Sequence, residues 1–400
     1  MRRHTVQART SRLSMFDKQL QQLEEQHLLR ELNSLESATG PTVTLNGRRV
    51  ILLASNDYLG LATHPVVVHA ACRAAEQFGA GSGASRLVCG TLPPHIELEA
   101  ALARFKGTEA ALVFSSGYLA NLGMIPALIG SGDIIYADRL CHASLIDGCR
   151  LSGAELRVFH HRDAGHLESL LARRAATRRA LIVTDGLFSM DGDIAPLKDL
   201  ADLAERFDAQ LLVDDAHGTG VMGQRGHGTL EYCGVERRIP FHMGTLGKAL
   251  GSSGAYVAGP ATVIRYLLNT ARSFIFTTAP PPASAAAATA ALNVIDTDPA
   301  RRDRLWANRE HLSSGLQHLG FRMPETVSPI VPVLIGDPER TVALSRKLLE
   351  EGVFAPAIRP PTVPKATSRI RLTVTSEHTR EQLDEALAAF QRAGTSLGLI

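Results

Sequence analysis

The sequence predicts an α/β fold in which a mostly parallel sheet is covered by helices on both faces. Short apolar runs alternate with amphipathic stretches from about residue 50 to residue 290, and strands buried on both faces read as such continuous apolar runs. After about residue 290 the alternation of apolar runs and amphipathic stretches changes, and a second set of segments predicts a smaller α/β unit. We therefore expect an N-terminal arm with a helix (1–50), a large domain (51–290) and a small C-terminal domain (291–400).

The large domain contains five apolar runs with the length of strands. They are AALVF (110–114), DIIYA (133–137), ALIVTD (180–185), AQLLVDD (209–215) and GAYVAG (254–259). Between two of them, LKDLADLAERF (197–207) has the apolar spacing of an amphipathic helix. Ahead of the sheet we expect a helix at about residues 15–33 that is polar all round and whose packing partner would be the small domain.

The small domain begins after an alanine-rich stretch, PPPASAAAATAALNVI (280–295), which is too short for a membrane span and fits a packed helix. A break at DTDPARRD (296–303) follows. The segments beyond it are helix-like WANREHLSSGLQHL, strand-like SPIVPVLIG, helix-like RTVALSRKLLEEG, the stretch FAPAIRPPTVP (354–364), strand-like SRIRLTVT, and a final helix from about Thr379 to Arg392.

Bulk composition describes a globular chain with no obvious affinity for nucleic acid or anionic membranes. The chain has 400 residues, 45% of them hydrophobic, and a formal net charge of +2. Five cysteines without C-x-x-C spacing indicate a reducing compartment. The first fourteen residues are basic but lack the apolar stretch of a signal peptide, so we expect a frayed leader, a possible true start at Met15, and a cytoplasmic protein.

Ligands of open α/β sheets bind at the carboxyl ends of the strands, so polar residues just past each strand are site candidates. After AALVF, the stretch SSGYLAN is a turn that opens a helix. It leaves the backbone N–H groups of Gly117 and Tyr118 at a positive helix N-terminus, which suits a phosphate group. An ordinary strand–helix turn explains the same residues.

After AQLLVDD, the stretch AHGTG places a histidine near a carboxylate. Asp214 ends a strand that should be buried, and His217 follows three residues later. A buried carboxylate is seldom tolerated without a cationic partner. A Ser-His-Asp hydrolase, a metal site and a carboxylate that pairs with a protonated ring nitrogen are all compatible with the pair. A hydrolase would want G-x-S-x-G after a strand, and GSGAS (81–85) breaks that pattern.

Two other strands also end in polar stretches. DRLCHASLIDG follows DIIYA and offers His142, while GLFSMDGDIAP follows ALIVTD and offers Ser189. Asp191 and Asp193 in the second stretch could hold a cation, but a turn capped by its own side chains fits as well. No metal is expected, because the histidines that are close in sequence fall in a polar, loop-like stretch (His160, His161 and His166).

Lys248 stands out in the stretch TLGKALGSSG (245–254). The chain has only six lysines among its 42 basic residues, and the neighbours of this one are small and uncharged. An amine in a confined, poorly solvated pocket has a depressed pKa and is a nucleophile near neutral pH. Together with a phosphate-suited helix start and a buried aspartate, such a lysine indicates a Schiff-base site for pyridoxal phosphate, with Asp214 keeping the pyridine nitrogen protonated.

The chain also resembles the α-oxoamine synthase family of fold-type I pyridoxal-phosphate enzymes, from about Phe16 to about Arg392. The stretches that carry the resemblance are SNDYLGL, GSGASR, SSGYLAN, DRLCHASLIDG, FSMDGDIAPL, VDDAHGTG, TLGKALGSSGAY and AIRPPTVP. The resemblance implies a fold-type I transferase with a large domain that binds pyridoxal 5'-phosphate.

The same resemblance implies a role for each matching residue. Lys248 would carry the cofactor and move protons at the substrate carbon, and Asp214 would pair with the ring nitrogen. His142 would stack on the ring and help to position the substrate. The other implied cofactor contacts are His217 at the ring hydroxyl, Ser189 near the ring, and Gly117, Tyr118 and Thr245 at the phosphate. Thr277 or Thr278 would reach the phosphate of a second subunit in a homodimer, and Arg30, Thr362 and Arg371 would contact substrate.

The segment FAPAIRPPTVP favours the branch of the family that condenses L-alanine with a pimeloyl thioester in biotin biosynthesis. The thioester carrier could be coenzyme A or an acyl carrier protein. The alternatives are a sister synthase that uses glycine and another acyl-CoA, a catalytically silent relative, and a nicotinamide-dependent oxidoreductase supported only by GAGSGAS (79–85). One departure from the family is Ala366, which stands where a glycine is usual. If the backbone there needs a positive φ, alanine costs roughly 1 kcal/mol.

Overall fold

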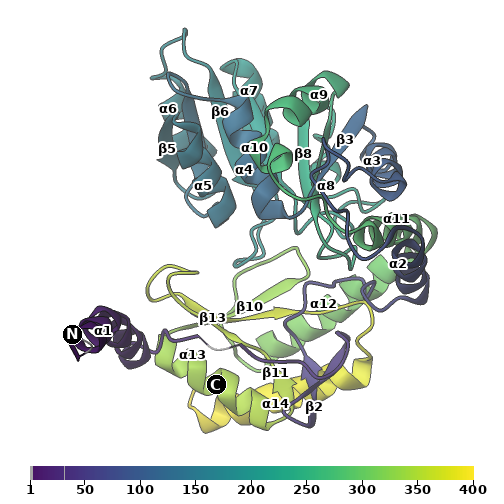
Figure 1. Ribbon diagram of the computed structural model, residues 1–400. Coiled ribbons are helices and arrows are strands. Elements are labelled where there is room, and N and C mark those ends of the chain that lie inside the picture. Colours follow the sequence, from purple (N-terminus) through teal and green to yellow (C-terminus); the bar gives the residue numbers. More distant parts are fainter. Residues whose placement is uncertain (1–2, 31) are drawn as a thin grey trace.

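The computed structural model describes residues 3–30 and 32–400, with side chains from Ser14 onward in the first helix, α1 (Arg3–Glu25). Figure 1 shows two bodies, one above the other, with helices α2 and α11 beside the junction and α1 standing away at one side. The upper body is built on the central sheet and the lower body on two small sheets.

The central sheet has seven strands in the order β3-β9-β8-β7-β6-β4-β5. Only β9 runs opposite to the others, so the predicted mostly parallel sheet is confirmed. The strands are β3 (Ala110–Phe114), β4 (Ile134–Asp138), β5 (Glu155–Phe159), β6 (Ala180–Asp185), β7 (Gln210–Asp214), β8 (Phe241–Thr245) and β9 (Ala255–Gly259).

Helices cover both faces of this sheet, because alternate residues of its strands enter different cores. Ile135 and Leu181 pack in one core with helices α4, α5, α9 and α10, whereas Tyr136 and Ile182 pack in another with α6, α7 and α8. These helices are α4 (Gly117–Leu128), α5 (Ala143–Ser152), α6 (Ala164–Leu171), α7 (Leu197–Arg206), α8 (Thr229–Cys233), α9 (Ala261–Thr270) and α10 (Arg272–Ile275). Strands β4, β6 and β9 are therefore buried at every residue.

The alanine-rich stretch forms α11 (Pro282–Thr297), which packs against α2 (Pro65–Phe78) and α3 (Pro93–Lys106). Its small side chains, such as Ala288 and Ala291, are fully buried and let the helices approach closely. Within residues 3–30 and 32–400, no helix has both the length and the hydropathy that crossing a membrane requires.

The lower body combines the C-terminal quarter of the chain, from α12 onward, with the N-terminal strands β1 and β2. β10, β13 and β12 form one antiparallel sheet. β1, β2 and β11 form a mixed sheet, in which the C-terminal strand β11 pairs in parallel with the N-terminal strand β2. The elements are β1 (Thr42–Leu45), β2 (Arg48–Leu52), α12 (Ala300–His318), β10 (Ile330–Gly336), α13 (Pro338–Glu350), β11 (Val353–Phe354), β12 (Ala357–Ile358), β13 (Ser368–Thr373) and α14 (Arg380–Ser396). The numerical domain boundaries remain a prediction.

The N-terminal helix differs from its prediction. It begins earlier and ends at Glu25 rather than near residue 33, so the stretch expected to be a frayed leader forms its first half. Its described part is not polar all round, since Met15, Phe16 and Leu20 are exposed. From residue 26 the chain leaves the helix and runs along the lower body, where the Arg359 guanidinium donates to the carbonyl oxygens of His27 and Leu29.

Candidate active site

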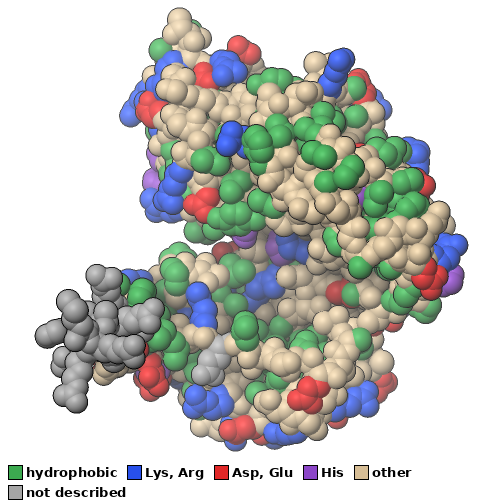
Figure 2. Space-filling view, in the orientation of Figure 1, with side chains coloured by type: hydrophobic (Ala, Val, Ile, Leu, Met, Phe, Trp, Pro, Cys, Tyr) green, Lys and Arg blue, Asp and Glu red, His purple; other side chains and the backbone are tan. Residues whose placement is uncertain are grey.

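The candidate site lies between the two bodies, at the carboxyl ends of the parallel strands. Figure 2 shows the molecule hollowed there, with basic and histidine side chains at the back of the hollow. Asp185 and Asp214 end the neighbouring strands β6 and β7, and Thr245 ends β8. The connecting segment that follows β8 carries Lys248.

Asp214 is buried and accepts hydrogen bonds only from neutral groups. Its Oδ2 atom lies 2.8 Å from Asn121 Nδ2, and its Oδ1 atom lies 3.0 Å from the backbone nitrogen of Ala216. In the described part of the chain, no lysine, arginine or histidine side chain forms an ion pair with this carboxylate. Because a buried carboxylate needs a cation, Asp214 is suited to a ligand that carries a protonated nitrogen.

Asp185 stands beside Asp214, directly opposite it in the parallel pairing of β6 and β7. Its Oδ2 atom accepts a hydrogen bond of 2.9 Å from the backbone nitrogen of His142. Burial, reinforced by the charge of Asp214, raises the pKa of Asp185 well above its usual range. Two adjacent buried carboxylates repel each other, so the Asp185 carboxyl group holds a proton more readily than an exposed aspartate does.

His142 caps α5, and its Nδ1 atom acts as an acceptor. The backbone nitrogen of Ser144 lies 3.3 Å from Nδ1 and can only donate, and the Ser144 hydroxyl lies 2.7 Å away. Asn121 Nδ2 donates to the same hydroxyl at 2.9 Å, so one hydrogen-bonded chain joins His142 to Asp214. The imidazole itself is exposed in the single chain, which leaves a face open for a planar ligand.

His217 is buried, and its Nδ1 atom lies 2.8 Å from the hydroxyl of Tyr58. Burial, together with the positive charges of Lys248 and Arg371, holds the pKa of His217 well below its usual range. The imidazole is therefore neutral at neutral pH. Its other nitrogen, Nε2, makes no hydrogen bond within residues 14–30 and 32–400.

Lys248 is half-buried and forms neither a hydrogen bond nor an ion pair with the residues that the structure describes. Burial lowers the pKa of its amine, while the carboxylates of Asp214 and Asp185 act in the opposite direction. The segment that carries Lys248 packs closely against the backbone at Ala62. Gly251 in this segment has a φ of 60°, and a Cβ atom there would lie 2.2 Å from the backbone nitrogen of Ala62. Glycine is required at this contact.

The predicted phosphate contacts lie close together at the start of α4. A Cβ atom on Gly117 would lie 2.8 Å from the methyl group of Thr245, so only glycine lets the helix start approach β8. Ser116 caps the helix by accepting from the nitrogen of Leu119, while the hydroxyl of Tyr118 points to Asp147 and donates to it. The first N–H groups of α4 are thus available to an anion.

Thr278 lies near this helix start in the same chain. Its carbonyl oxygen accepts from the hydroxyl of Ser115 at 3.3 Å, and its backbone pairs with Ser85. Thr277 precedes it and is half-buried. A role for either threonine in a partner's site therefore remains a prediction.

Arg371 connects the lower body to the upper one. From β13 it donates to the carbonyl oxygen of Ser189, in the segment after β6, and to Asn56 and the Tyr58 hydroxyl at 3.2 and 3.4 Å. The guanidinium group is buried without an acidic partner among the described residues. A buried, unpaired cation beside His217 is suited to a carboxylate.

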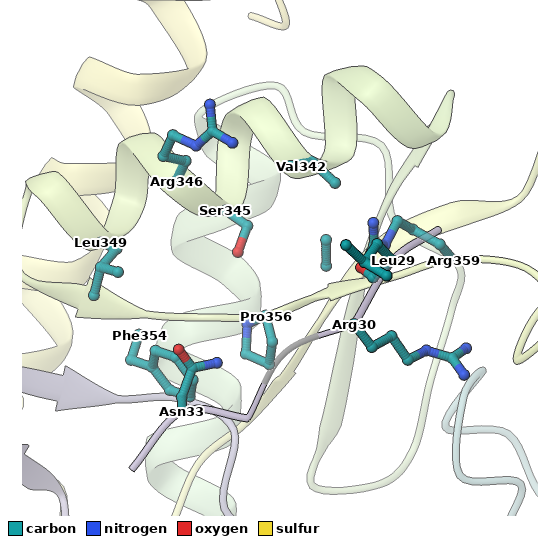
Figure 3. A pocket seen from close by; sticks show the side chains of 11 residues that line it. Leu29, Arg30, Asn33, Val342, Ser345, Arg346, Leu349, Phe354, Pro356 and Arg359 are labelled. Atoms are coloured by element: carbon teal, nitrogen blue, oxygen red, sulfur yellow. The ribbon is translucent and has the colours of Figure 1, made fainter. Parts of the chain in front are cut away.

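The two remaining predicted substrate residues contact each other across the sequence. Arg30 Nη2 donates to the hydroxyl of Thr362 at 3.1 Å. Arg30 also lines a pocket of about 470 Å³ between the N-terminal segment and α13. Figure 3 shows Arg346 and Arg359 around the same pocket. In the described chain, none of these three arginines pairs with an acidic side chain, so the pocket favours an anion.

The two alternatives weighed for Asp214 find little support. Ser144 does contact a histidine, but its side chain is 1% exposed and cannot attack a substrate. Asp191 is paired with Arg369, and Asp193 with His161 and Arg162. Among the residues that the structure describes, no group of three or more histidine, cysteine or acidic side chains has the arrangement that a metal ion needs.

Sequence reasoning missed four residues of this site. Asn121 and Tyr58 lie inside the motifs SSGYLAN and SNDYLGL, and Asp185 is the last residue of a predicted strand, so each had a signal in its position. Arg359 lies in AIRPPTVP, but its contact with residues 27–29 could not be read from the local sequence.

Known proteins are similar to this chain over nearly its whole length. Residues 48–390 match the model of the family described as aminotransferase class I and II. The chain is 51% identical over 384 residues to an 8-amino-7-oxononanoate synthase of Geobacter sulfurreducens, covering 96% of this chain and 98% of that one. It is 50% identical to an enzyme of the same name from Trichlorobacter lovleyi, and the match covers 97% of this chain and 100% of that one.

Solved structures agree. A serine palmitoyltransferase from S. paucimobilis with a bound PLP–myriocin aldimine has a TM-score of 0.93 and 36% identity, covering 98% of this chain and 99% of that chain. An 8-amino-7-oxononanoate synthase from Francisella tularensis has a TM-score of 0.75 and 28% identity, covering 88% and 99%. The chain therefore belongs to the aminotransferase class I and II family, and to the same family as these 8-amino-7-oxononanoate synthases.

Proposed function

We propose that the protein is a pyridoxal-phosphate-dependent acyltransferase. It condenses L-alanine with a pimeloyl thioester to give 8-amino-7-oxononanoate, CO2 and a free thiol, in biotin biosynthesis. The observation that carries this proposal is identity near 50% over nearly the full length with enzymes of that name, in a chain whose cleft gathers Lys248, Asp214, His217 and His142.

The residues present fit pyridoxal 5'-phosphate. Asp214 is a buried carboxylate without a cation, and it would hold a protonated ring nitrogen. His217 keeps Nε2 free for the ring hydroxyl, and Lys248 keeps an unpaired amine for the aldehyde. The start of α4, at Gly117, together with Thr245, would hold the phosphate group.

When bound, this cofactor supplies an electron sink for the carbon that loses its proton. Lys248 takes the Cα proton of alanine; burial lowers the pKa of its amine and so favours the uncharged form that can accept a proton. The Cα atom then bonds to the thioester carbonyl carbon, the C–S bond breaks, and the thiolate leaves and takes a proton from solvent. Next the bond from Cα to the alanine carboxylate breaks, CO2 leaves, and Lys248 returns a proton to Cα.

The remaining side chains hold and orient the substrates. Arg371 offers a buried cation to a substrate carboxylate, and His142, at the start of α5, would stack on the ring and help to position the substrate. Arg30 and Thr362, joined by their hydrogen bond, would hold the acyl donor near the arginine-lined pocket of Figure 3. An anionic donor, whether a coenzyme A or an acyl carrier protein thioester, suits that pocket.

Assembly and location complete the proposal. The protein would work as a cytoplasmic homodimer with shared sites, in which Thr277 or Thr278 reaches the partner's phosphate site. The exposed apolar residues Leu87, Val88 and Phe276 support this proposal. Leu87 and Phe276 lie close in sequence to the paired residues Ser85 and Thr278, and a second subunit would cover them.

A four-way assay tests the substrates. Purified protein is offered L-alanine or glycine with a pimeloyl or an acetyl thioester, and thiol release and CO2 are measured. The proposal expects turnover with L-alanine and the pimeloyl donor at least tenfold above every other combination. Preference for glycine with an acetyl or other short acyl donor would instead identify the sister synthase.

A further inference from the structure

Tyr58 is a buried tyrosine whose hydroxyl lies between the two halves of the site. Its side chain is 0% exposed. The hydroxyl is 2.8 Å from His217 Nδ1 in the upper body and 3.4 Å from Arg371 Nη2 in the lower body. It is also 3.4 Å from Asn56 Oδ1. The donor and acceptor chemistry of these groups decides which atom donates in each contact.

Arg371 can only donate, so the Tyr58 oxygen accepts from it. The single proton of the hydroxyl can then go to His217 Nδ1 or to Asn56 Oδ1. The distance to Nδ1 is typical of a strong hydrogen bond, whereas 3.4 Å is at the limit. Asn56 Oδ1 also accepts from Arg371 Nη2 at 3.2 Å and could accept a second hydrogen bond, so the shorter distance to Nδ1 decides the assignment. The Tyr58 hydroxyl therefore donates to Nδ1.

This assignment fixes the proton of His217. A neutral imidazole carries one N–H, and an Nδ1 that accepts from Tyr58 leaves that proton on Nε2. Nε2 has no hydrogen-bond partner among the described residues. Burial, together with the positive charges of Lys248, Arg371 and His142 that act on the ring, lowers the pKa of His217. Nε2 is thus an N–H donor directed at the cleft.

We propose that Tyr58 is a positioning residue that fixes His217 as the Nε2–H tautomer and thereby presents a hydrogen-bond donor to an acceptor oxygen in the cleft. The tautomer rests only on contacts within the chain. The identification of that acceptor as the ring oxygen of the cofactor rests on the proposed function. The Tyr58 hydroxyl also accepts a hydrogen bond from Arg371. One hydroxyl group therefore supports both His217 and the arginine proposed to bind the substrate carboxylate.

Nitrogen-15 NMR of histidine-labelled, cofactor-free protein tests the tautomer directly. His217→Gln assigns the resonances by removing them. In the wild type, Nδ1 should show a pyridine-like shift and Nε2 a pyrrole-like shift. In Tyr58→Phe, which keeps the ring and loses the hydroxyl, both shifts should move toward the average of the two tautomers.

Tyr256→Phe is the matched control. Tyr256 is equally buried, and its hydroxyl bonds Thr219 at 2.9 Å rather than a histidine. This variant should leave the His217 shifts unchanged. A pyrrole-like Nδ1 in the wild type, or unchanged shifts in Tyr58→Phe, would overturn the proposal. The wild-type measurement decides even if Tyr58→Phe fails to fold, and because it needs no turnover, its failure is distinct from failure of the proposed function.

Discussion

Asp185 and Asp214 are paired in register at the ends of neighbouring strands, yet their environments differ. Asp214 accepts two hydrogen bonds from neutral donors, and Asp185 accepts one, from the backbone nitrogen of His142. Burial and the charge of Asp214 raise the pKa of Asp185. The charge of its neighbour therefore makes Asp185 hold a proton more readily than a lone aspartate would.

This asymmetry predicts opposite outcomes for two matched substitutions. Asp185→Asn replaces a carboxyl group of raised pKa with a neutral amide of the same shape and should keep activity within about threefold. Asp214→Asn removes the partner of the ring nitrogen and should lower kcat by orders of magnitude. Steady-state rates with L-alanine and a pimeloyl thioester measure both. Equal losses, or the reverse order, would contradict the assignment.

His161 predicts a pH-dependent contribution to stability. Its ring nitrogens lie 2.9 Å from Asp138 and 2.9 Å from Asp193, and although burial acts in the opposite direction, these bonds raise the pKa of His161 to about 9. A raised histidine pKa means that the protonated form stabilises the fold below pH ~6.5 and that this contribution is lost as pH rises to about 9.

His161→Gln should therefore lower the free energy of unfolding by roughly 2 kcal/mol at pH 6, and by much less at pH 9.5. Urea unfolding at both pH values measures the difference. His160→Gln is the control, because the His160 side chain is 59% exposed. A loss in His161→Gln that is the same at both pH values would show that its charge does not stabilise the fold.

Ala366 predicts a stabilising substitution. Its φ is 61°, the left-handed region that favours glycine, so the departure noted in the sequence falls on a position that needs a positive φ. Ala366→Gly should raise the free energy of unfolding by roughly 1 kcal/mol. Ala172→Gly, at an exposed residue with a φ of −61°, should lower it. Urea unfolding measures the free energy of unfolding of both variants. A value for Ala366→Gly below that of the wild type would contradict the account.

Arg359 predicts a change in acyl-donor binding. It donates to the carbonyl oxygens of His27 and Leu29 and so holds the segment that presents Arg30. Arg359→Gln should raise the KM for the pimeloyl thioester by about tenfold, roughly 1.4 kcal/mol, with little change in the KM for L-alanine. Arg340→Gln, whose guanidinium donates to Gly398 instead, is the control. Equal changes in the KM for the two substrates would contradict a specific role of Arg359 in binding the acyl donor.

The sequence predicted the strands that read as continuous apolar runs and missed those whose runs polar or charged residues interrupt. AALVF and ALIVTD coincide with β3 and β6 because strands covered on both faces need continuous apolar runs. β5 is an edge strand with the exposed residue Glu155, and β8 contains His242 and Thr245, so neither shows such a run. Residues at strand ends were predictable because the topology of the sheet brings them together.

Contacts between distant segments were not predictable from local pattern. Tyr58 meets His217 and Arg371 only because three segments converge on one cleft. The raised pKa of Asp185 likewise depends on burial and on the pairing of β6 with β7, which brings Asp214 beside it, rather than on its own neighbours in the sequence.

The central claim is that Lys248 is the amine that holds pyridoxal 5'-phosphate. Holoenzyme is reduced with borohydride, digested, and analysed by mass spectrometry, so that the five other lysines of the chain serve as internal controls. The account predicts a phosphopyridoxyl adduct on the peptide that contains Lys248, and loss of that adduct in Lys248→Ala. An adduct on another lysine, or none on protein that turns over substrate, would contradict it.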